Sequence, residues 1–392
     1  MNPSHASLPR LDLGRRLIWA GLAVGNAIAL FAHWRSGGWL FHQDWSVYAH
    51  DYISHWAAGK RVLQGQAALV YDGPTQIDFQ TELINAPKPV KYGFFYPPPF
   101  LFTTLPFASL DLVPAYIAFL VTTVALYVLA LRQITRDWGI AAFAAIAGGG
   151  AYFSLLYVQN GFLTAALLTA GIALLPSRPR LAGILLGILT IKPQLGILVP
   201  FALAAAGYWR TIGWAAATAI ILALLAGAAF GPDVWTAFLS SRGETAGFLE
   251  AGSIWFKMQS PFAFSLPLFG STAAYAIHFL LAAVVGWQVI NVWRSPIHSV
   301  WLKGSILIAG SLLMSPYLFA YDAVMITAAA LMLVRENPLI PVTDRIALLG
   351  ACILPGLANS IFSIAVPMAA VILLVLALRQ TERSVGARVS SG

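Results

Sequence analysis

Charged residues are scarce in this chain of 392 residues, of which only 10% are Asp, Glu, Lys or Arg. A soluble domain usually has about 25% charged residues to cover its surface. The sequence also lacks a glycine-rich phosphate loop, a Gly-x-Ser-x-Gly elbow and any segment polar enough for an α/β domain. These absences exclude a soluble protein and any nucleotide-binding domain of the familiar soluble kinds.

Cysteine is almost absent as well, since Cys352 is the single one and lies inside an apolar run. No intrachain disulfide is therefore possible, and the redox compartment stays open. The 23 Lys and Arg residues exceed the 15 Asp and Glu residues, which gives a net charge of +8. These cations are dispersed at the ends of apolar runs, so we interpret them as topological anchors and expect no nucleic-acid partner.

Hydrophobic residues make up 59% of the chain, so a lipid bilayer must supply the contacts that water cannot. At about 20 residues per crossing, about 11–13 spans use most of the chain. We therefore predict an all-α fold, a polytopic membrane helical bundle. Arg10, Arg15 and Arg16 precede the first apolar run, which begins at Leu17 and ends in large residues, so we expect an uncleaved anchor.

The positive-inside rule gives a topology with a cytoplasmic N-terminus. Later cationic junctions, on alternate loops, are Arg178/Arg180, Arg210, Arg294/Lys303, Arg335/Arg345 and Arg379/Arg383/Arg388. We expect residues 1–16 and 379–392 to be cytoplasmic, residues 17–378 to form one membrane domain, and residues 35–92 and 230–270 to be extracytoplasmic loops. Arg132 and Arg136 also look cytoplasmic, but counting each apolar run as one crossing places them on the extracytoplasmic side. Either the Pro97–Pro99 segment is a half-membrane element or one run between Gly139 and Leu175 is broken.

The first outer loop is unusually acidic and has helical periodicity. Its five acids are Asp44, Asp51, Asp72, Asp78 and Glu82. Ile53, Trp56, Ala57 and Leu63 recur at helical spacing before a stop signal at Gly65. We predict a helix in the membrane interface with Lys60 reaching outward, and a second one starting with a capping box at Thr75.

Five segments carry a resemblance to a known family. They are DYISHWAAGKRVLQGQAALVYD (51–72), FFYPPPFLFTTLP (94–106), VQNGFLTAALL (158–168), LAGILLGILTIKPQLGILVPF (181–201) and SPYLFAYDAVM (315–325). In this order they resemble glycosyltransferase family 87, the polyprenyl-phosphate-mannose-dependent mannosyltransferases of bacterial membranes. The matches span about residues 17–334. Each motif alone is weak, whereas the ordered set is fairly specific for the family and not for one substrate.

The resemblance implies a GT-C-like fold with its active site at the outer face and a catalytic aspartate in the first outer loop, which Asp51 matches best. It also implies a polyprenyl-phosphate sugar donor, a glycan or glycolipid acceptor, no cofactor, and a multi-pass protein of the inner (plasma) membrane. Two residues depart from the family pattern. His55 stands where an aromatic residue is usual, and Val158 stands where a glycine is common before Gln159.

The residues themselves leave alternatives open for Asp51. A carboxylate at the membrane surface can deprotonate an acceptor hydroxyl, but Asp is also a good helix N-cap. Asp44 is a second candidate base. His55, four residues after Asp51, would share its helix face and could orient the carboxylate. His50, Asp51 and His55 form only a weak metal pattern, so the proposed chemistry requires no metal.

Further substrate-binding candidates interrupt or flank apolar runs. Cations stabilise a departing phosphate, which makes Lys192 and Lys257 candidates; the alternatives are a snorkelling lysine and a solvated loop charge. Polar or aromatic groups at helix ends bind sugars or merely tie helices together. These additional candidates are Tyr96, Gln159, Asn160, Gln194, Tyr317, Tyr321 and Asp322.

Two other function classes compete with an inverting membrane glycosyltransferase. A transporter or lipid flippase is expected to have an internal repeat and mid-membrane charges, whereas here no convincing repeat is present and acids gather in an outer loop. A glycan polymerase or ligase of envelope polysaccharide shares the architecture of many spans and a large outer loop. Flux of a labelled substrate without a covalent product would indicate a transporter or flippase. Products lengthened by whole blocks would indicate a polymerase or ligase.

Overall fold

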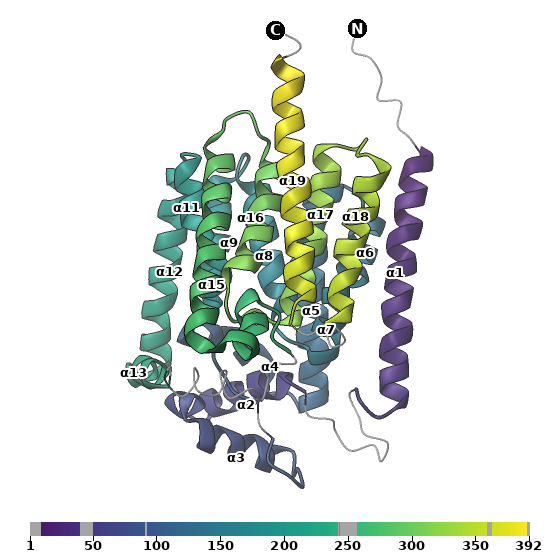
Figure 1. Ribbon diagram of the computed structural model, residues 1–392. Helices are drawn as coiled ribbons and strands as arrows, with labels where there is room; N and C mark the ends of the chain where they lie inside the picture. The colour runs from purple at the N-terminus through teal and green to yellow at the C-terminus, as the bar shows by residue number, and fades with distance from the viewer. Residues whose placement is uncertain are drawn as a thin grey trace.

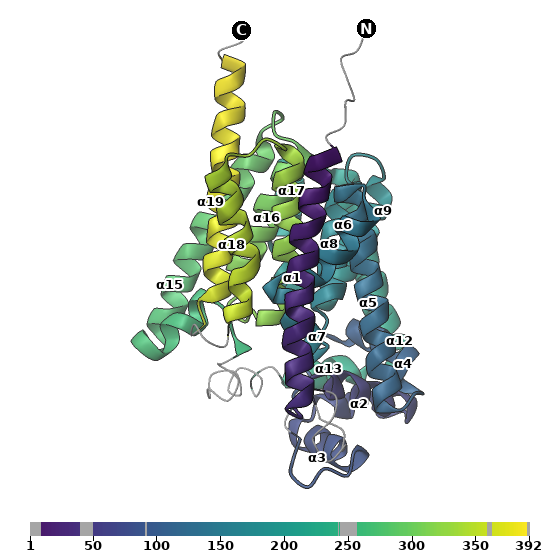
Figure 2. The ribbon, with the colours of Figure 1, turned by 90° about the vertical axis from the view of Figure 1, so that its right-hand side faces the viewer.

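The computed structural model describes residues 9–39, 50–90, 92–241, 243, 257–358 and 363–389. Within these ranges every element is helical, apart from an isolated bridge between Met258 and Phe319. The helices stand side by side, and α1 (Pro9–Arg35) begins at the same end of the bundle at which α19 (Ala365–Val389) ends (Figures 1 and 2). The predicted all-α membrane fold is therefore confirmed.

Fewer long spans are present than the 11–13 expected. Among the described residues, five helices are long and apolar enough to cross a membrane, and a bent pair makes a sixth. The five segments are Arg16–Arg35 of α1, α5 (Leu112–Thr135), α12 (Trp209–Phe230), α15 (Pro261–Arg294) and Ala365–Arg383 of α19. The pair is α6 (Trp138–Ala147) and α7 (Gly149–Tyr157), which meet at 72° around Gly148. Most other apolar runs do form helices, but glycine and proline end them early.

Several shorter apolar helices end before reaching the far face of the bundle (Figure 1). They are α8 (Gly161–Leu174), α9 (Pro179–Ile188), α11 (Leu198–Ala205), α16 (Val300–Met314) and α17 (Val324–Glu336). A helix of 13–15 residues rises about 20–23 Å, less than the roughly 30 Å of a hydrocarbon core. Because α8, α16 and α17 are also almost wholly buried, their inner ends meet within the protein. Irregular backbone at that depth is shielded from lipid.

All the cationic junctions gather at the end of the bundle where α1 begins. Arg16 pairs with Asp137, which joins the start of α1 to the turn after α5. Arg383 pairs with Asp344 at 2.8 Å, joining the end of α19 to the start of α18 (Val342–Ile353). Arg132 and Arg136 lie at this same end because α4 (Leu101–Ala108) is too short to cross. The structure contains both features that the sequence offered as alternatives, namely a short α4 after Pro97–Pro99 and a run that breaks at Gly148 between α6 and α7.

The first outer loop folds across the opposite end of the bundle (Figure 1). Its helices are α2 (Tyr52–Leu63), η1 (Ala67–Tyr71), α3 (Gly73–Leu83) and η2 (Pro98–Phe100), which leads into α4. The predicted first helix is confirmed and stops at Gly65, whose φ of 71° favours glycine. The predicted capping box at Thr75 is wrong, because Asp72 caps α3 by accepting from the Thr75 backbone N–H at 3.0 Å.

Helix α2 is packed between other elements of the protein. Most of its side chains are buried under α3, α4 and α5, and Trp56 donates its indole N–H to the Leu110 carbonyl at 2.9 Å. Lys60 lies over the Trp56 ring at 5.0 Å, so its ammonium is held against this packing rather than reaching freely outward. The helix is therefore an internal element of the loop, and it fixes the residue that precedes it, Asp51.

Candidate functional site

Asp51 lies directly before α2, at the end of the bundle opposite the cationic junctions. Its side chain makes no cap hydrogen bond to α2, and its backbone is already helical, with φ −52° and ψ −27°. Instead the carboxylate forms an ion pair with Lys257, and both side chains are about one-tenth exposed. The interpretation of Asp51 as a simple helix cap is therefore wrong.

Lys257 reaches Asp51 from a loop that is pinned to the inner bundle. The neighbouring Gln259 backbone N–H donates to the Leu318 carbonyl at 2.7 Å, and Met258 bridges Phe319. The Lys257 ammonium lies over the rings of Tyr92 and Tyr157, at 5.0 and 4.5 Å. A buried cation that pairs with a carboxylate and two aromatic faces is not a solvated loop charge, so that alternative is wrong.

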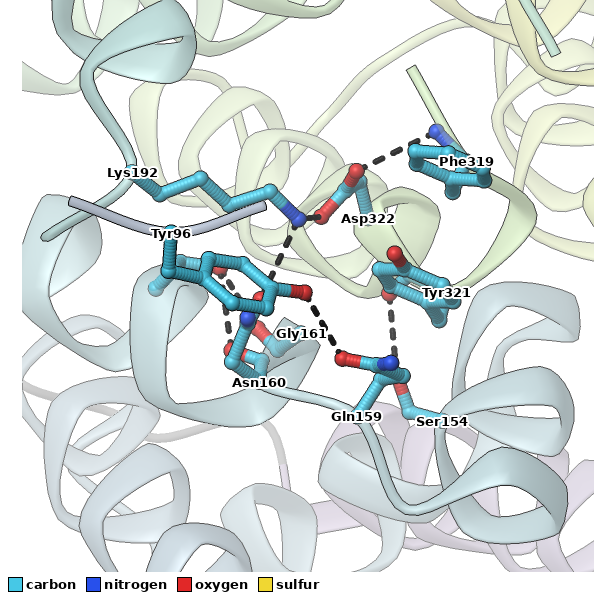
Figure 3. Close-up of polar contacts among 10 residues, drawn as sticks. Tyr96, Ser154, Gln159, Asn160, Gly161, Lys192, Phe319, Tyr321 and Asp322 are labelled. Carbon is cyan, nitrogen blue, oxygen red and sulfur yellow. Dashed lines mark hydrogen bonds and ion pairs between the residues drawn. The ribbon is translucent and has the colours of Figure 1, made fainter. Parts of the chain in front are cut away.

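A second ion pair lies deeper, where the inner helices end (Figure 3). The Lys192 ammonium donates to Asp322 at 2.5 Å and to the Asn160 amide oxygen at 3.1 Å, and it lies 4.7 Å from the Tyr321 ring centroid. The other Asp322 oxygen accepts from the Phe319 backbone N–H at 3.2 Å. Lys192 is 1% exposed, so it is not a snorkelling lysine.

Local sequence explains why these side chains meet. Pro193 follows Lys192 and begins α10 (Pro193–Gly196), so the helical run that starts at α9 breaks at the lysine. Gly161 begins α8 against the chain around Tyr321, where an added Cβ would lie 2.3 Å from the Tyr321 carbonyl oxygen. Glycine is thus required there for the N-terminus of α8 to approach Asp322.

Val158 occupies a strained backbone position beside these groups. Its φ of 45° and ψ of 57° are left-handed, a conformation that a β-branched residue adopts only against steric cost. This is the position at which the family resemblance leads us to expect glycine. The turn it forms ends α7 and presents Gln159 and Asn160 to the two ion pairs, so the strain is located at the candidate site.

Tyr96 lies near the carboxylates of both ion pairs, Asp322 and Asp51. Its hydroxyl donates to the Gln159 side-chain oxygen at 2.9 Å (Figure 3). Its ring stacks on Phe100 with centroids 4.2 Å apart. Burial, and after it the negative charge of Asp322, raise the pKa of Tyr96 above its ordinary value. The phenol therefore stays protonated and serves as a hydrogen-bond donor.

His55 is enclosed by aromatic rings one helical turn after Asp51. Its ring centroid lies 4.9 Å from that of Phe100 and 5.3 Å from that of Tyr96. Neither ring nitrogen has a hydrogen-bond partner, so the predicted bond to Asp51 is absent. Burial, and after it the charge of Lys192, lower the pKa of His55 to about 3. The imidazole is therefore neutral at physiological pH.

Several predicted residues are not brought into this cluster. Gln194 is partly exposed and makes no hydrogen bond with the cluster among the described residues. The Tyr317 hydroxyl shares a 2.5 Å hydrogen bond with Tyr275 and packs with Phe262 of α15. Asp44 lies outside the described residues. Within those residues, no group of three or more His, Cys, Asp or Glu side chains is placed to hold a metal.

Other residues at the site were missed by the sequence interpretation. Ser154 donates to the Tyr321 carbonyl at 2.9 Å, and Gln259 donates to the Ala358 carbonyl at 3.0 Å. Tyr92 and Tyr157 form the aromatic faces for Lys257. The position of Tyr157, directly before the Val158–Leu168 motif, was a usable signal, whereas nothing in the sequence around Tyr92 pointed to a distant lysine.

The cluster provides groups for acid–base chemistry and for holding an anion. One carboxylate, Asp51, lies at the end of the bundle opposite the cationic junctions and pairs with Lys257, and a second lysine, Lys192, pairs with Asp322. The N-terminus of α8 also meets the site at Asn160, whose side-chain amide nitrogen has no partner. Helix N-termini and ammonium groups favour negatively charged ligands. A carboxylate beside such an anion site suits proton removal coupled to phosphate departure.

Comparison with known proteins gives one match. The model of "Glycosyltransferase family 87" matches residues 94–316, more than half of the chain. The matched range includes Tyr96, Gln159, Asn160, Lys192 and Lys257, while Asp51 and Asp322 lie outside it. No curated protein and no solved structure matches the chain.

Proposed function

The chain belongs to glycosyltransferase family 87 and is a membrane glycosyltransferase, and from this premise we propose which sugar transfer it performs. The reaction is inverting transfer of a mannosyl-like sugar from a polyprenyl phosphate to an extracytoplasmic glycan or glycolipid. The bilayer delivers such a donor in the plane of the membrane, which agrees with the lack of a nucleotide-binding domain. The observation that carries the proposal is the buried Asp51–Lys257 ion pair.

Asp51 is the proposed general base. As the acceptor oxygen attacks the anomeric carbon, the bond from that carbon to the donor phosphate breaks on the opposite side. The acceptor proton passes to the Asp51 carboxylate, and the polyprenyl phosphate departs with the electron pair of the broken bond. General-base catalysis of this kind contributes about 10²–10⁴-fold to a rate.

Lys257 is the proposed phosphate contact. Its ammonium pairs with Asp51 and is carried by a loop, so a phosphate can compete for it. Transfer of Lys257 from the carboxylate to the phosphate would free Asp51 as a base and stabilise the leaving group in one movement. Lys192 is held by Asp322 and Asn160, so we assign it to positioning and to the positive field beneath the phosphate.

The remaining polar groups are proposed to bind the sugar. Tyr96 and Gln159 form a hydrogen-bonded pair beside the site, and the unpartnered amide of Asn160 can donate to a hydroxyl. All cationic junctions lie at the opposite end of the bundle. By the positive-inside rule, this supports an active site that faces the extracytoplasmic side of the inner membrane.

The proposal is tested by incubating purified, reconstituted protein with radiolabelled polyprenyl-phosphate-mannose and extracting lipids and glycans. Asp51→Asn is expected to reduce transfer by about 10²–10⁴-fold while retaining donor binding. Asp78→Asn is the matched control, because Asp78 is an exposed acid of the same loop. Normal turnover by Asp51→Asn would refute the assignment, and labelled products longer by whole blocks would favour the polymerase or ligase alternative.

A further inference from the structure

A cavity of about 740 Å³ lies at the end of the bundle opposite Asp51. Its walls come from α1, the turn between α5 and α6, α17 and α18, and most of them are apolar, including Trp19, Leu331 and Leu348. Ile18 and Ile346 line it from α1 and α18 and are 52% and 66% exposed. The cavity is therefore bordered by side chains that face the surrounding lipid.

Three arginines line this cavity, namely Arg136, Arg335 and Arg345. None of them forms an ion pair within the part of the chain that the structure describes. One carboxylate, Asp137, also lines the cavity, and it and two neighbouring acids in the chain have other partners. Asp137 pairs with Arg16, Glu336 accepts from the Ser299 hydroxyl, and Asp344 pairs with Arg383. The cavity thus has an excess of positive charge.

The arginines retain hydrogen-bonding capacity. Arg335 donates to the Ile134 carbonyl and lies over the Trp301 ring at 4.5 Å, and the charge of Arg136 acts on it unfavourably. Arg345 donates to the carbonyls of Ile340 and Pro338, at 2.8 and 3.4 Å. A guanidinium has five N–H donors, so each keeps donors free for an anion. An anion placed here would also relieve the repulsion between Arg136 and Arg335.

We propose that this cavity is a binding site for an anionic phospholipid, with the phosphate between the arginines and an acyl chain along the apolar walls. Charge complementarity favours a phosphate, and guanidinium groups bind phosphate oxygens in pairs. The apolar walls and lipid-facing border favour a lipid over a free ion. Basic pockets between membrane helices at the cytoplasmic face bind anionic headgroups on the same grounds. This site is separate from the sugar-transfer site and does not depend on the proposed function.

Native mass spectrometry of the purified full-length protein tests the site, with phosphatidylglycerol or phosphatidylcholine added to the detergent. We expect phosphatidylglycerol to bind at least ten times more tightly than phosphatidylcholine. Arg136→Gln is expected to weaken phosphatidylglycerol binding about 5-fold, and Arg136→Gln with Arg345→Gln about 25-fold, from about 1 kcal/mol per arginine near a surface. Arg178→Gln is the matched control, because Arg178 is exposed and outside the cavity lining.

A second variant tests the cavity itself rather than its charge. Gly14 lines the cavity, and a Cβ built there meets nothing within 4 Å, so Gly14→Trp adds a bulky side chain at the cavity wall without a backbone clash. We expect it to abolish retention of the lipid. Gly21→Trp on the same helix is the control, because Gly21 also has open space but lies outside the lining.

Three outcomes would overturn the proposal. They are equal binding of the two lipids, equal loss in Arg178→Gln and Arg136→Gln, and full retention of lipid by Gly14→Trp. Inorganic phosphate is added in a separate arm. If it competes at millimolar concentration and Gly14→Trp has no effect, the arginines bind a free anion and not a lipid.

Discussion

The two lysine–aspartate pairs of this protein have the same chemistry but different surroundings. In the Lys192–Asp322 pair, the side chains are 1% and 0% exposed, and Asn160 and the Phe319 backbone supply further hydrogen bonds. In the Asp51–Lys257 pair, both side chains are about 10% exposed, and aromatic rings surround the lysine. The Lys192–Asp322 pair is held by the ends of helices. The Asp51–Lys257 pair is carried by a loop and by the junction between a loop and α2.

This difference indicates a division of roles. Buried charges that are fully hydrogen-bonded cannot exchange partners without a large desolvation penalty. The Lys192–Asp322 pair therefore fixes where the short inner helices meet. The Asp51–Lys257 pair is more exposed and lies nearer the end of the bundle opposite the cationic junctions, which supports the proposal that a substrate phosphate displaces one partner.

The largest effect on stability is expected from breaking the deeper pair. Lys192→Met leaves the Asp322 carboxylate buried without its partner, which destabilises a protein by about 3–5 kcal/mol. The double variant Lys192→Met with Asp322→Leu is expected to recover most of this loss, because no charge remains buried. Thermal unfolding in detergent measures both. If the single and double variants unfold at the same temperature, the pair does not hold the helices together.

Breaking the outer pair is expected to affect catalysis more than stability. Lys257→Met removes the proposed phosphate contact and should lower kcat/KM by about 10²-fold, similar to the loss of one group that stabilises a developing anion. Lys257→Arg should retain part of the activity. The unfolding temperature should fall less than in Lys192→Met. A Lys257→Met variant with wild-type kcat/KM would contradict the proposed partner exchange.

His55, one helical turn after Asp51, gives a pH prediction. Its pKa of about 3 in the folded protein is below the ordinary value of 6.5, so between these values only the unfolded chain binds the proton. Above pH 6.5 the neutral His55 costs no stability. As pH falls below 6.5, the free energy of unfolding decreases, and the loss reaches about 2 kcal/mol at pH 5.

The variant His55→Phe suits the aromatic surroundings and has no proton to bind. Its unfolding temperature should therefore fall less than that of the wild type between pH 7 and pH 5. Parallel curves for the two proteins would show that His55 is not held neutral by burial.

The smallest effect concerns Val158, in the turn next to both pairs. The left-handed conformation costs about 1–2 kcal/mol for a residue with a side chain, and glycine avoids this cost. Val158→Gly should therefore be at least as stable as Val158→Ala, although it removes more buried atoms. Unfolding temperatures of the two variants decide this. A clearly less stable glycine variant would show that the turn is not strained.

Local features of the site were predictable from particular residues. The helix after Asp51 and its end at Gly65 followed from apolar periodicity and a glycine, and the break at Lys192 followed from the lysine and proline in an apolar run. Periodicity identified the apolar face of α2 but not that α3, α4 and α5 cover it, because the cover depends on tertiary packing. The count of long spans was too high, because composition does not distinguish one long helix from two short ones.

The sequence alone determined that the chain enters a membrane, that its fold is helical, and which end of the bundle collects the cations, because these depend on composition and on residues close together in the chain. Only the tertiary structure decided which charges pair. Lys257 and Asp51 are 206 residues apart, and Lys192 and Asp322 are 130 apart. Their meeting depends on short inner helices that end at a shared depth, which is a consequence of packing and of no local pattern.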